Sequence, residues 1–326
     1  MILQSDVIGW SWPSVRELLP LDLDGLAVES GCLVRRRGVV GGEALARTLM
    51  LVGLPNASLE RASKMACEIG LAKMNTTALF KRLVRSEPFL KAMFCETLNH
   101  AMDVSERWGK YRLLAVDATV LCGPGATGTD QRLHTVYDLS KGLPLSVELT
   151  GPKGGEALWR HCSFGHGDLL LCDSGYGYNN SFRWALDLGA SFLIRFNFAT
   201  VTLYDEQDRR ILAQEADAMI PVTGTTEVSV RMPEWPNPLR AVGGRNLEGE
   251  PRWILTNLSA AEVPHQEVRQ LYRKRWQVEL FFKRLKSLLD SDQLPTRDGP
   301  TARPWIWAKL LLASLAVLIG HERFSP

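Results

Sequence analysis

Helical periodicity dominates the chain between residue 43 and about residue 100. Residues 43–52, residues 59–69 and a stretch beginning at Asn75 place apolar side chains three and four positions apart, which is typical of amphipathic helices. Pro88 interrupts this pattern, and another helix follows it. Residues 1–42 contain several prolines and glycines and show no strong period. The pattern therefore predicts an α-helical N-terminal region.

A short turn at residues 70–74 separates two of the predicted helices. The second of them carries Lys81, Arg82 and Arg85. Two helices joined by a tight turn, with basic residues on the second, are typical of a helix-turn-helix that contacts DNA. A three-helix bundle without DNA contacts produces the same pattern, so both interpretations remain open. Another basic group, residues 35–37, lies upstream.

From Tyr111 the helical period gives way to short apolar runs between glycine-rich turns, which predict strands. Two runs are wholly apolar and lead directly into a carboxylate: residues 113–116 precede Asp117, and residues 169–172 precede Asp173. The other predicted strands are residues 132–137, 143–150, 191–196 and 252–258. Helices are predicted at residues 182–188 and 262–289. This order of elements indicates an α/β domain with a mixed sheet flanked by helices.

Two domain-level expectations follow from this pattern. Residues 1–108 form the helical N-terminal region, and residues 109–326 form the α/β domain. Within the α/β domain, residues 198–250 are polar and rich in proline and glycine, and they predict an insertion of small strands and loops.

The stretch from Leu271 to Asp290 separates into stripes when it is plotted at 100° per residue. Its predicted buried arc consists of Leu271, Val278, Phe282, Leu285 and Leu289. A neighbouring arc carries Tyr272, Arg275, Glu279 and Lys286, and Trp276 flanks it. An exposed stripe stabilised by pairs of charges would look similar, although each such pair contributes only a few tenths of a kcal/mol.

Composition narrows the class of protein without identifying it. The hydrophobic fraction of 45% and charged fraction of 23% are ordinary for a globular protein, and a net charge of +2 provides no global basic field. Instead, seven basic residues crowd the segment 269–286 around Glu279. The six cysteines form no CxxC pair, which indicates a reducing compartment. We expect no signal peptide and no membrane span, since the apolar run 310–320 is too short, and therefore a cytoplasmic protein.

The carboxylates suggest a chemistry. Asp117 and Asp173 are expected at the rim of the sheet, and Glu279 on a helix. Taken singly, each aspartate also fits an ordinary turn or cap. Three converging carboxylates, however, form an oxygen-rich site for hard divalent cations such as Mg²⁺. Two such ions ~4 Å apart promote in-line phosphoryl displacement, and the nearby basic residues fit a phosphate-bearing polymer as substrate.

These residues resemble a known family. Tyr272, Arg275, Glu279 and Lys286 have the spacing Y-x2-R-x3-E-x6-K, which is similar to the signature of the insertion sequence four family of bacterial DDE transposases. Residues 116–139 and 165–178 resemble the segments around the first and second aspartates of that family. Residues 58–94 resemble its helical N-terminal region.

The resemblance implies an RNase H-like core whose catalytic residues, Asp117, Asp173 and Glu279, bind Mg²⁺ or Mn²⁺. It also implies a β-rich insertion at about 198–250 and a DNA-binding role for residues 1–108. The residues expected to contact DNA near the cleaved end are Tyr272, Arg275, Trp276 and Lys286. The alternatives without a DNA contact are that the Tyr272 hydroxyl forms a hydrogen bond within the core and that Trp276 fills space in the core.

The implied function is a transposase that binds the double-stranded terminal inverted repeats of its element, cleaves them and joins the 3′ ends to target DNA. Synapsis of two ends implies a homodimer, acting in the cytoplasm of a bacterium at the nucleoid. Alternatives are an RNase H-like nuclease without strand transfer and a catalytically dead DNA-binding remnant. Two departures from the family stand out: Ser174 replaces the arginine of an Asp-Arg-Gly-Tyr motif, and many relatives extend further at the C-terminus.

Overall fold

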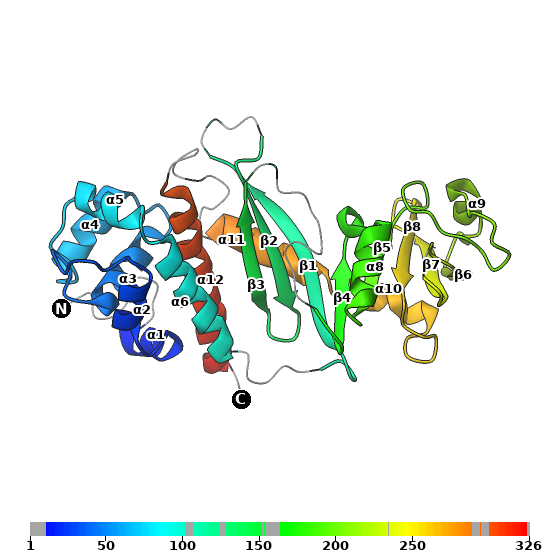
Figure 1. The fold of residues 1–326 in the computed structure, drawn as a ribbon, viewed down its shortest axis with the longest axis horizontal. Helices are drawn as coiled ribbons and strands as arrows, with labels where there is room; N and C mark the ends of the chain where they lie inside the picture. The colour runs from blue at the N-terminus through cyan, green and yellow to red at the C-terminus, as the bar shows by residue number, and fades with distance from the viewer. Residues whose placement is uncertain are drawn as a thin grey trace.

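A computed structural model describes residues 11–101, 107–123, 125, 128–151, 153, 164–233, 235–288, 294 and 300–324. Its centre is one eight-stranded mixed sheet in the order β3-β2-β1-β4-β5-β8-β7-β6 (Figure 1). The strands are β1 (Arg112–Leu121), β2 (Gln131–Asp138), β3 (Leu143–Thr150), β4 (Asp168–Cys172), β5 (Ser191–Phe196), β6 (Thr225–Val230), β7 (Leu239–Arg245) and β8 (Pro251–Thr256). The mixed α/β sheet expected from the sequence is confirmed.

The middle of the sheet is parallel because β1, β4 and β5 run in the same direction. Their neighbours β2 and β8 pair with them antiparallel. Alternate residues of β4 enter two different cores: Leu169 and Leu171 face one, and Leu170 and Cys172 face the other. A strand covered on both faces has no polar face, which explains why β4 reads as a continuous apolar run.

Helices cover both faces of the sheet. On one side α8 (Asn179–Asp187) connects β4 to β5, and Phe182 and Ala185 bury themselves in the core there. On the other side lie α10 (His265–Arg273), α11 (Trp276–Leu288) and α12 (Ala302–Phe324). The insertion contributes α9 (Ala213–Ala218) together with β6 and β7, and these two strands extend the main sheet through β8.

The N-terminal region is helical, as expected. Its helices are α1 (Trp12–Leu18), α2 (Leu23–Glu29), α3 (Gly42–Val52), α4 (Leu59–Glu68), α5 (Thr76–Leu83) and α6 (Glu87–Ala101). The first two were not predicted, because helices of seven residues are too short to establish a period. Ser58 and Asn75 cap α4 and α5 by accepting hydrogen bonds from backbone amides.

Helix α12 joins the N-terminal helices to the sheet, and Figure 1 shows it beside α6. Trp307 is buried against Phe94 of α6 with a ring distance of 5.4 Å, and Arg303 binds Glu87 at 2.7 Å. Residues 302–320 are long and apolar enough to cross a membrane, but 78% of their most apolar window is buried within the protein. Helix α12 is therefore a core helix of this fold.

The single helix expected over residues 262–289 is wrong, because two helices meet at Lys274 and Arg275. The amides of Lys274 and Arg275 bond to carbonyls three residues back, and so do those of Gln277 and Val278. Such bonds tighten the chain to about three residues per turn, so the faces of α11 are rotated relative to those of α10. No glycine or proline marks this junction in the sequence, and Leu289 and Asp290 lie outside the described residues.

Candidate active site

The register between β1 and β4 brings two of the predicted carboxylates to the same edge. The last parallel pair is Val116 with Cys172, so Asp117 and Asp173 are the next residues on two adjacent strands. The sequence predicted that the strand ends at Asp117, and this is wrong. Strand β1 continues as a hairpin with β2 and pairs Asp117 with Thr135. Only the parallel pairing ends at this point.

Both aspartates are oriented by backbone amides. Asp117 Oδ1 accepts a hydrogen bond from the amide of Ala118 at 2.8 Å. Asp173 caps the short helix η1 (Ser174–Tyr176), and its Oδ1 accepts from the amide of Gly175 at 2.9 Å. Each aspartate therefore has one oxygen held by the backbone.

Glu279 reaches the same place from α11. The apolar side of this helix packs on the sheet through Val278, Phe282 and Leu285, all buried in one core. This packing leaves Glu279 at the edge of an open hollow of about 540 Å³. The hollow is lined by Asp117, Ala118, Asp173, Glu279, Phe282, Lys283 and Lys286. Three carboxylates that lie far apart in the sequence thus share one cavity, together with two lysines.

Arg275 spans two of these carboxylates. Its Nη1 donates to Asp117 Oδ2 at 2.9 Å, and its Nη2 pairs with Glu279 Oε1. The arginine side chain is only 11% exposed, whereas that of Glu279 is 37% exposed. In this state the guanidinium is the counter-ion of the carboxylate cluster.

Burial and charge perturb the acidity of this site. Burial raises the pKa of Asp117 to about 6, and the carboxylates of Asp173 and Glu279 act in the same direction. Arg275 and the Ala118 amide oppose that rise. Burial also raises the pKa of Tyr272 to about 12, so its hydroxyl stays protonated.

The hydroxyl of Tyr272 donates to the carbonyl of Cys172 at 3.0 Å. This bond ties the end of α10 to the residue immediately before Asp173. The structure therefore gives Tyr272 the within-core hydrogen bond that the sequence left as an alternative. Trp276, by contrast, is 61% exposed and is not a core filler.

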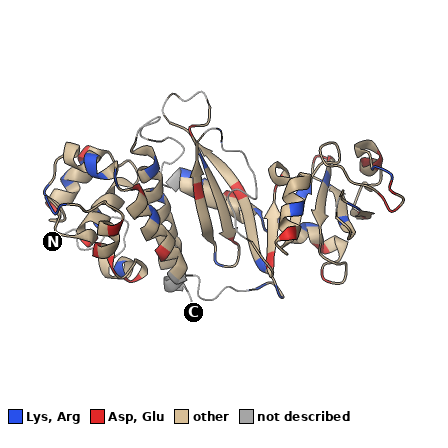
Figure 2. Cartoon of the chain, in the orientation of Figure 1, with Lys and Arg blue, Asp and Glu red and all other residues tan. Residues whose placement is uncertain are grey.

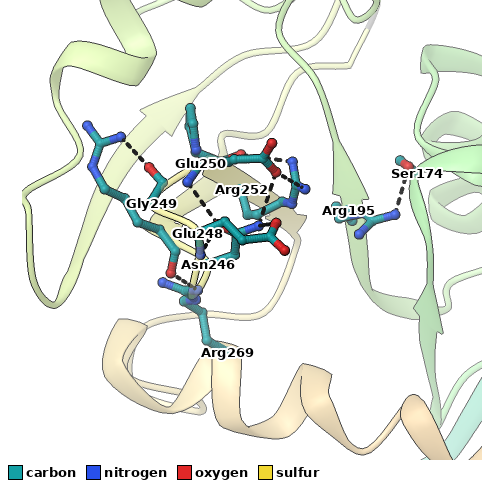
Figure 3. A network of polar contacts seen from close by, with 10 residues as sticks. Ser174, Arg195, Asn246, Glu248, Gly249, Glu250, Arg252 and Arg269 are labelled. Atoms are coloured by element: carbon teal, nitrogen blue, oxygen red, sulfur yellow. Dashed lines mark hydrogen bonds and ion pairs between the residues drawn. The ribbon is translucent and has the colours of Figure 1, made fainter.

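A second hollow, also of about 540 Å³, lies beside Trp276. Five arginines line it, Arg195, Arg252, Arg269, Arg273 and Arg275, together with Asn246, Ile254, Tyr272 and Trp276. Arg275 therefore lies between this basic hollow and the carboxylates. Figure 3 shows the β7–β8 turn that edges it, where Asn246 and Glu250 bond to each other and Glu250 pairs with Arg252.

Arg195 of β5 is a site residue that the sequence pattern did not single out. Its Nη2 donates to Ser174 Oγ at 3.0 Å (Figure 3). A guanidinium from the neighbouring strand thus lies beside the position where the resembled motif carries its own arginine. One signal was available: Arg195 interrupts the otherwise apolar run Phe192–Phe196.

The donor set fits a hard divalent cation, because it consists of carboxylate oxygens. Within the described ranges, no three His, Cys, Asp or Glu side chains form a ready-made ligand shell. Arg275 occupies an oxygen of both Asp117 and Glu279, so an entering cation competes with its guanidinium.

Comparison with known proteins decides the family. The family model of the transposase DDE domain matches residues 108–315 of the sequence, which is more than half of the chain. The chain belongs to the transposase DDE domain family. This transposase is 27% identical over 332 residues to the putative transposase InsL for insertion sequence element IS186A of Escherichia coli (strain K12), covering 91% of this chain and 90% of the relative. The transposase for insertion sequence element IS421 of Escherichia coli is equally similar, at 27% identity and the same coverage.

A solved structure confirms the fold of the transposase. The piggyBac transposase synaptic complex with hairpin DNA matches with a TM-score of 0.50 and 10% identity, over 94% of this chain and 72% of that one. An identity this low shows the fold alone, and it supports the RNase H-like arrangement expected from the sequence. The transposase is thus a DNA-acting enzyme, and its family implies a divalent cation.

Proposed function

We propose that this protein is a member of the insertion sequence four family that cleaves the ends of its own element and joins the freed 3′ hydroxyls to target DNA. The observation that carries the proposal is the shared hollow, in which Asp117, Asp173 and Glu279 line a cavity together with Lys283 and Lys286. Carboxylates alone would repel a phosphodiester. Lysines at the rim of the same cavity attract one.

Asp117, Asp173 and Glu279 would hold Mg²⁺ or Mn²⁺. Bound there, the ions would stabilise the charge on the attacking and leaving oxygens of an in-line displacement. The protein contributes orientation, since backbone amides fix both aspartates and the apolar face of α11 fixes Glu279. Tyr272 holds the end of β4 in place through the Cys172 carbonyl.

Tyr272, Arg275, Trp276 and Lys286 are proposed to position the DNA end. Arg275 has two roles in this proposal: it neutralises carboxylates in the free protein and moves to a phosphate when DNA is bound. The basic hollow on its other side provides a place for that phosphate. Trp276 is exposed at the edge of the same hollow and is free to stack on a base.

At the level of the whole molecule, we propose that residues 1–108 bind the terminal inverted repeats and residues 109–326 carry out the chemistry. Two ends must be held together for joining, so the active form is a homodimer on double-stranded DNA. The protein works in the cytoplasm at the bacterial nucleoid. The two regions are packed against each other through α6 and α12.

The direct test uses a DNA fragment that carries the genomic ends flanking this gene. Incubation with the protein and Mg²⁺ is expected to cleave at the element boundary and to join the end to a supercoiled plasmid. Cleavage without joining would favour the nuclease alternative. Binding without cleavage would favour the catalytically dead remnant.

The pH dependence of metal binding gives a second test. Below about pH 6 the affinity for Mn²⁺ is expected to fall about tenfold per pH unit, because the carboxyl of Asp117, with its raised pKa, must lose a proton to bind an ion. Above that pH the affinity should be constant. The free ion is measured by electron paramagnetic resonance. Asp117→Asn should bind weakly and without this transition, and an equal affinity of the wild type at pH 5 and pH 7 would contradict the assignment.

Trp276→Ala is expected to weaken binding of an end fragment by roughly 1–3 kcal/mol without changing thermal stability, because an exposed aromatic stacks on a base but supports no core. Trp276→Phe should retain most of the affinity. Binding is measured by fluorescence anisotropy and stability by calorimetry. Unchanged affinity of the alanine variant would exclude stacking at this position.

A further inference from the structure

The segment of residues 33–40, between α2 and α3, presents three consecutive arginines. Arg35, Arg36 and Arg37 are all exposed, while Val39 is buried beside them. Figure 2 shows both signs of charge along the whole molecule, in keeping with its net charge of +2. The three consecutive arginines are therefore a local concentration of positive charge on the surface. We call residues 33–40 the basic loop.

The basic loop is fixed to the turn between α4 and α5. The amide of Lys73, in that turn, donates to the carbonyl of Gly38 at 2.8 Å, and Val39 forms a β-bridge with Ala72. Gly38 has a φ of +73°, and a Cβ there would lie 2.6 Å from the Lys73 carbonyl oxygen. Only glycine fits this close approach without strain. The loop and the turn thus form one surface.

Arg82 of α5 holds the loop from its inner side. Its guanidinium donates to the carbonyl oxygens of Cys32 at 3.4 Å, Arg35 at 2.8 Å and Arg37 at 2.9 Å. The sequence pattern had placed Arg82 with Lys81 and Arg85 as a candidate DNA contact. The structure gives it a different task, because its donors are directed at the backbone of the loop.

This arrangement gathers like charges in a small volume. The guanidinium of Arg82 lies against the backbone of a loop that carries three more, and Lys73 is exposed next to it. Arg36 is 3.7 Å from Asp24. In the described part of the chain, Arg35 and Arg37 have no carboxylate within ion-pair distance. Several cationic side chains on a fixed backbone bind closely spaced anions well. The phosphates of duplex DNA are such anions.

We infer that the basic loop grips the phosphate backbone of duplex DNA beside the α4–α5 unit, and that Arg82 acts as a positioning residue for it. The inference rests on the proposed function, of which it specifies one DNA contact. Figure 1 places α2 and α3 at one end of the molecule and α11 behind the sheet. The gripped phosphates therefore lie inside the terminal repeat, away from the cleaved bond. Contacts of this kind set register and carry no base specificity.

The test uses the full-length double variant Arg35→Ala/Arg37→Ala and an end fragment, with binding measured across a range of salt concentrations. Losing two phosphate contacts should lower the slope of log K against log salt by about 2. Hydroxyl-radical footprinting should show lost protection inside the repeat and retained protection at the cleaved end. The matched control, Arg209→Ala/Arg210→Ala, removes two exposed arginines from the insertion and should keep the wild-type slope.

Two further variants separate the loss of charge from a change in the loop's structure. Arg35→Lys/Arg37→Lys keeps both charges and should keep the slope. Arg82→Ala leaves the loop arginines in place but removes the side chain that positions the loop, and it should lose protection inside the repeat. A wild-type slope in the alanine double variant would overturn the inference and leave the proposed function intact. A wild-type protein that binds no end fragment would remove the proposed function itself.

Discussion

Glu279→Gln is expected to slow cleavage of the end fragment by about 10³-fold or more while leaving binding of that fragment nearly unchanged. The substitution keeps the shape of the side chain and a hydrogen-bond acceptor for Arg275, but it removes one of the three carboxylate charges that line the hollow. Losing several kcal/mol of transition-state charge stabilisation corresponds to a rate loss of this size. Single-turnover cleavage in Mg²⁺ measures the rate, and anisotropy measures the binding.

Glu267→Gln is the matched control. Glu267 lies exposed on α10, carries the same charge and does not line the hollow. Its cleavage rate should equal that of the wild type. An undiminished rate in Glu279→Gln would remove Glu279 from the active site, and the three-carboxylate assignment with it.

Arg275→Ala should destabilise the protein in the presence of a chelator by about 2–3 kcal/mol, and saturating Mg²⁺ should restore much of this loss. Removing one partner of a buried charge pair leaves the other charge uncompensated, which costs about 3–5 kcal/mol when both partners are fully buried. Asp117 is 16% exposed and Glu279 is 37% exposed, so solvent reduces the cost here. A divalent cation can replace the missing guanidinium. Urea unfolding with and without Mg²⁺ measures both effects.

Arg273→Ala provides the comparison, because Arg273 is exposed, lies two residues before Arg275 and, within the described residues, forms an ion pair with neither carboxylate. Its stability should match that of the wild type under both conditions. If Mg²⁺ stabilises the wild type and Arg275→Ala equally, then the guanidinium and the cation do not compete for the same oxygens. The proposed transfer of Arg275 from carboxylate to phosphate would then lose its basis.

Local patterns in the sequence were enough to predict the elements whose burial follows a simple period. The apolar run before Asp173 predicted β4, because a strand buried on both faces needs apolar residues at every position. The helical periods of α3 to α5 followed from one buried face each. The spacing from Tyr272 to Lys286 selected the residues of the candidate site through its resemblance to a family signature, and that resemblance does not depend on where the helix breaks.

How these residues meet, and which way they face, depends on the packing of the whole fold. The junction at Arg275 divides the expected helix, and the register of β1 with β4 sets Asp117 next to Asp173. Arg82 turns inward to carbonyl oxygens, whereas the equally basic residues 35–37 face solvent. Periodicity records only whether a side chain is buried. The partner of a charged side chain depends on segments that are distant in sequence and are brought together by packing.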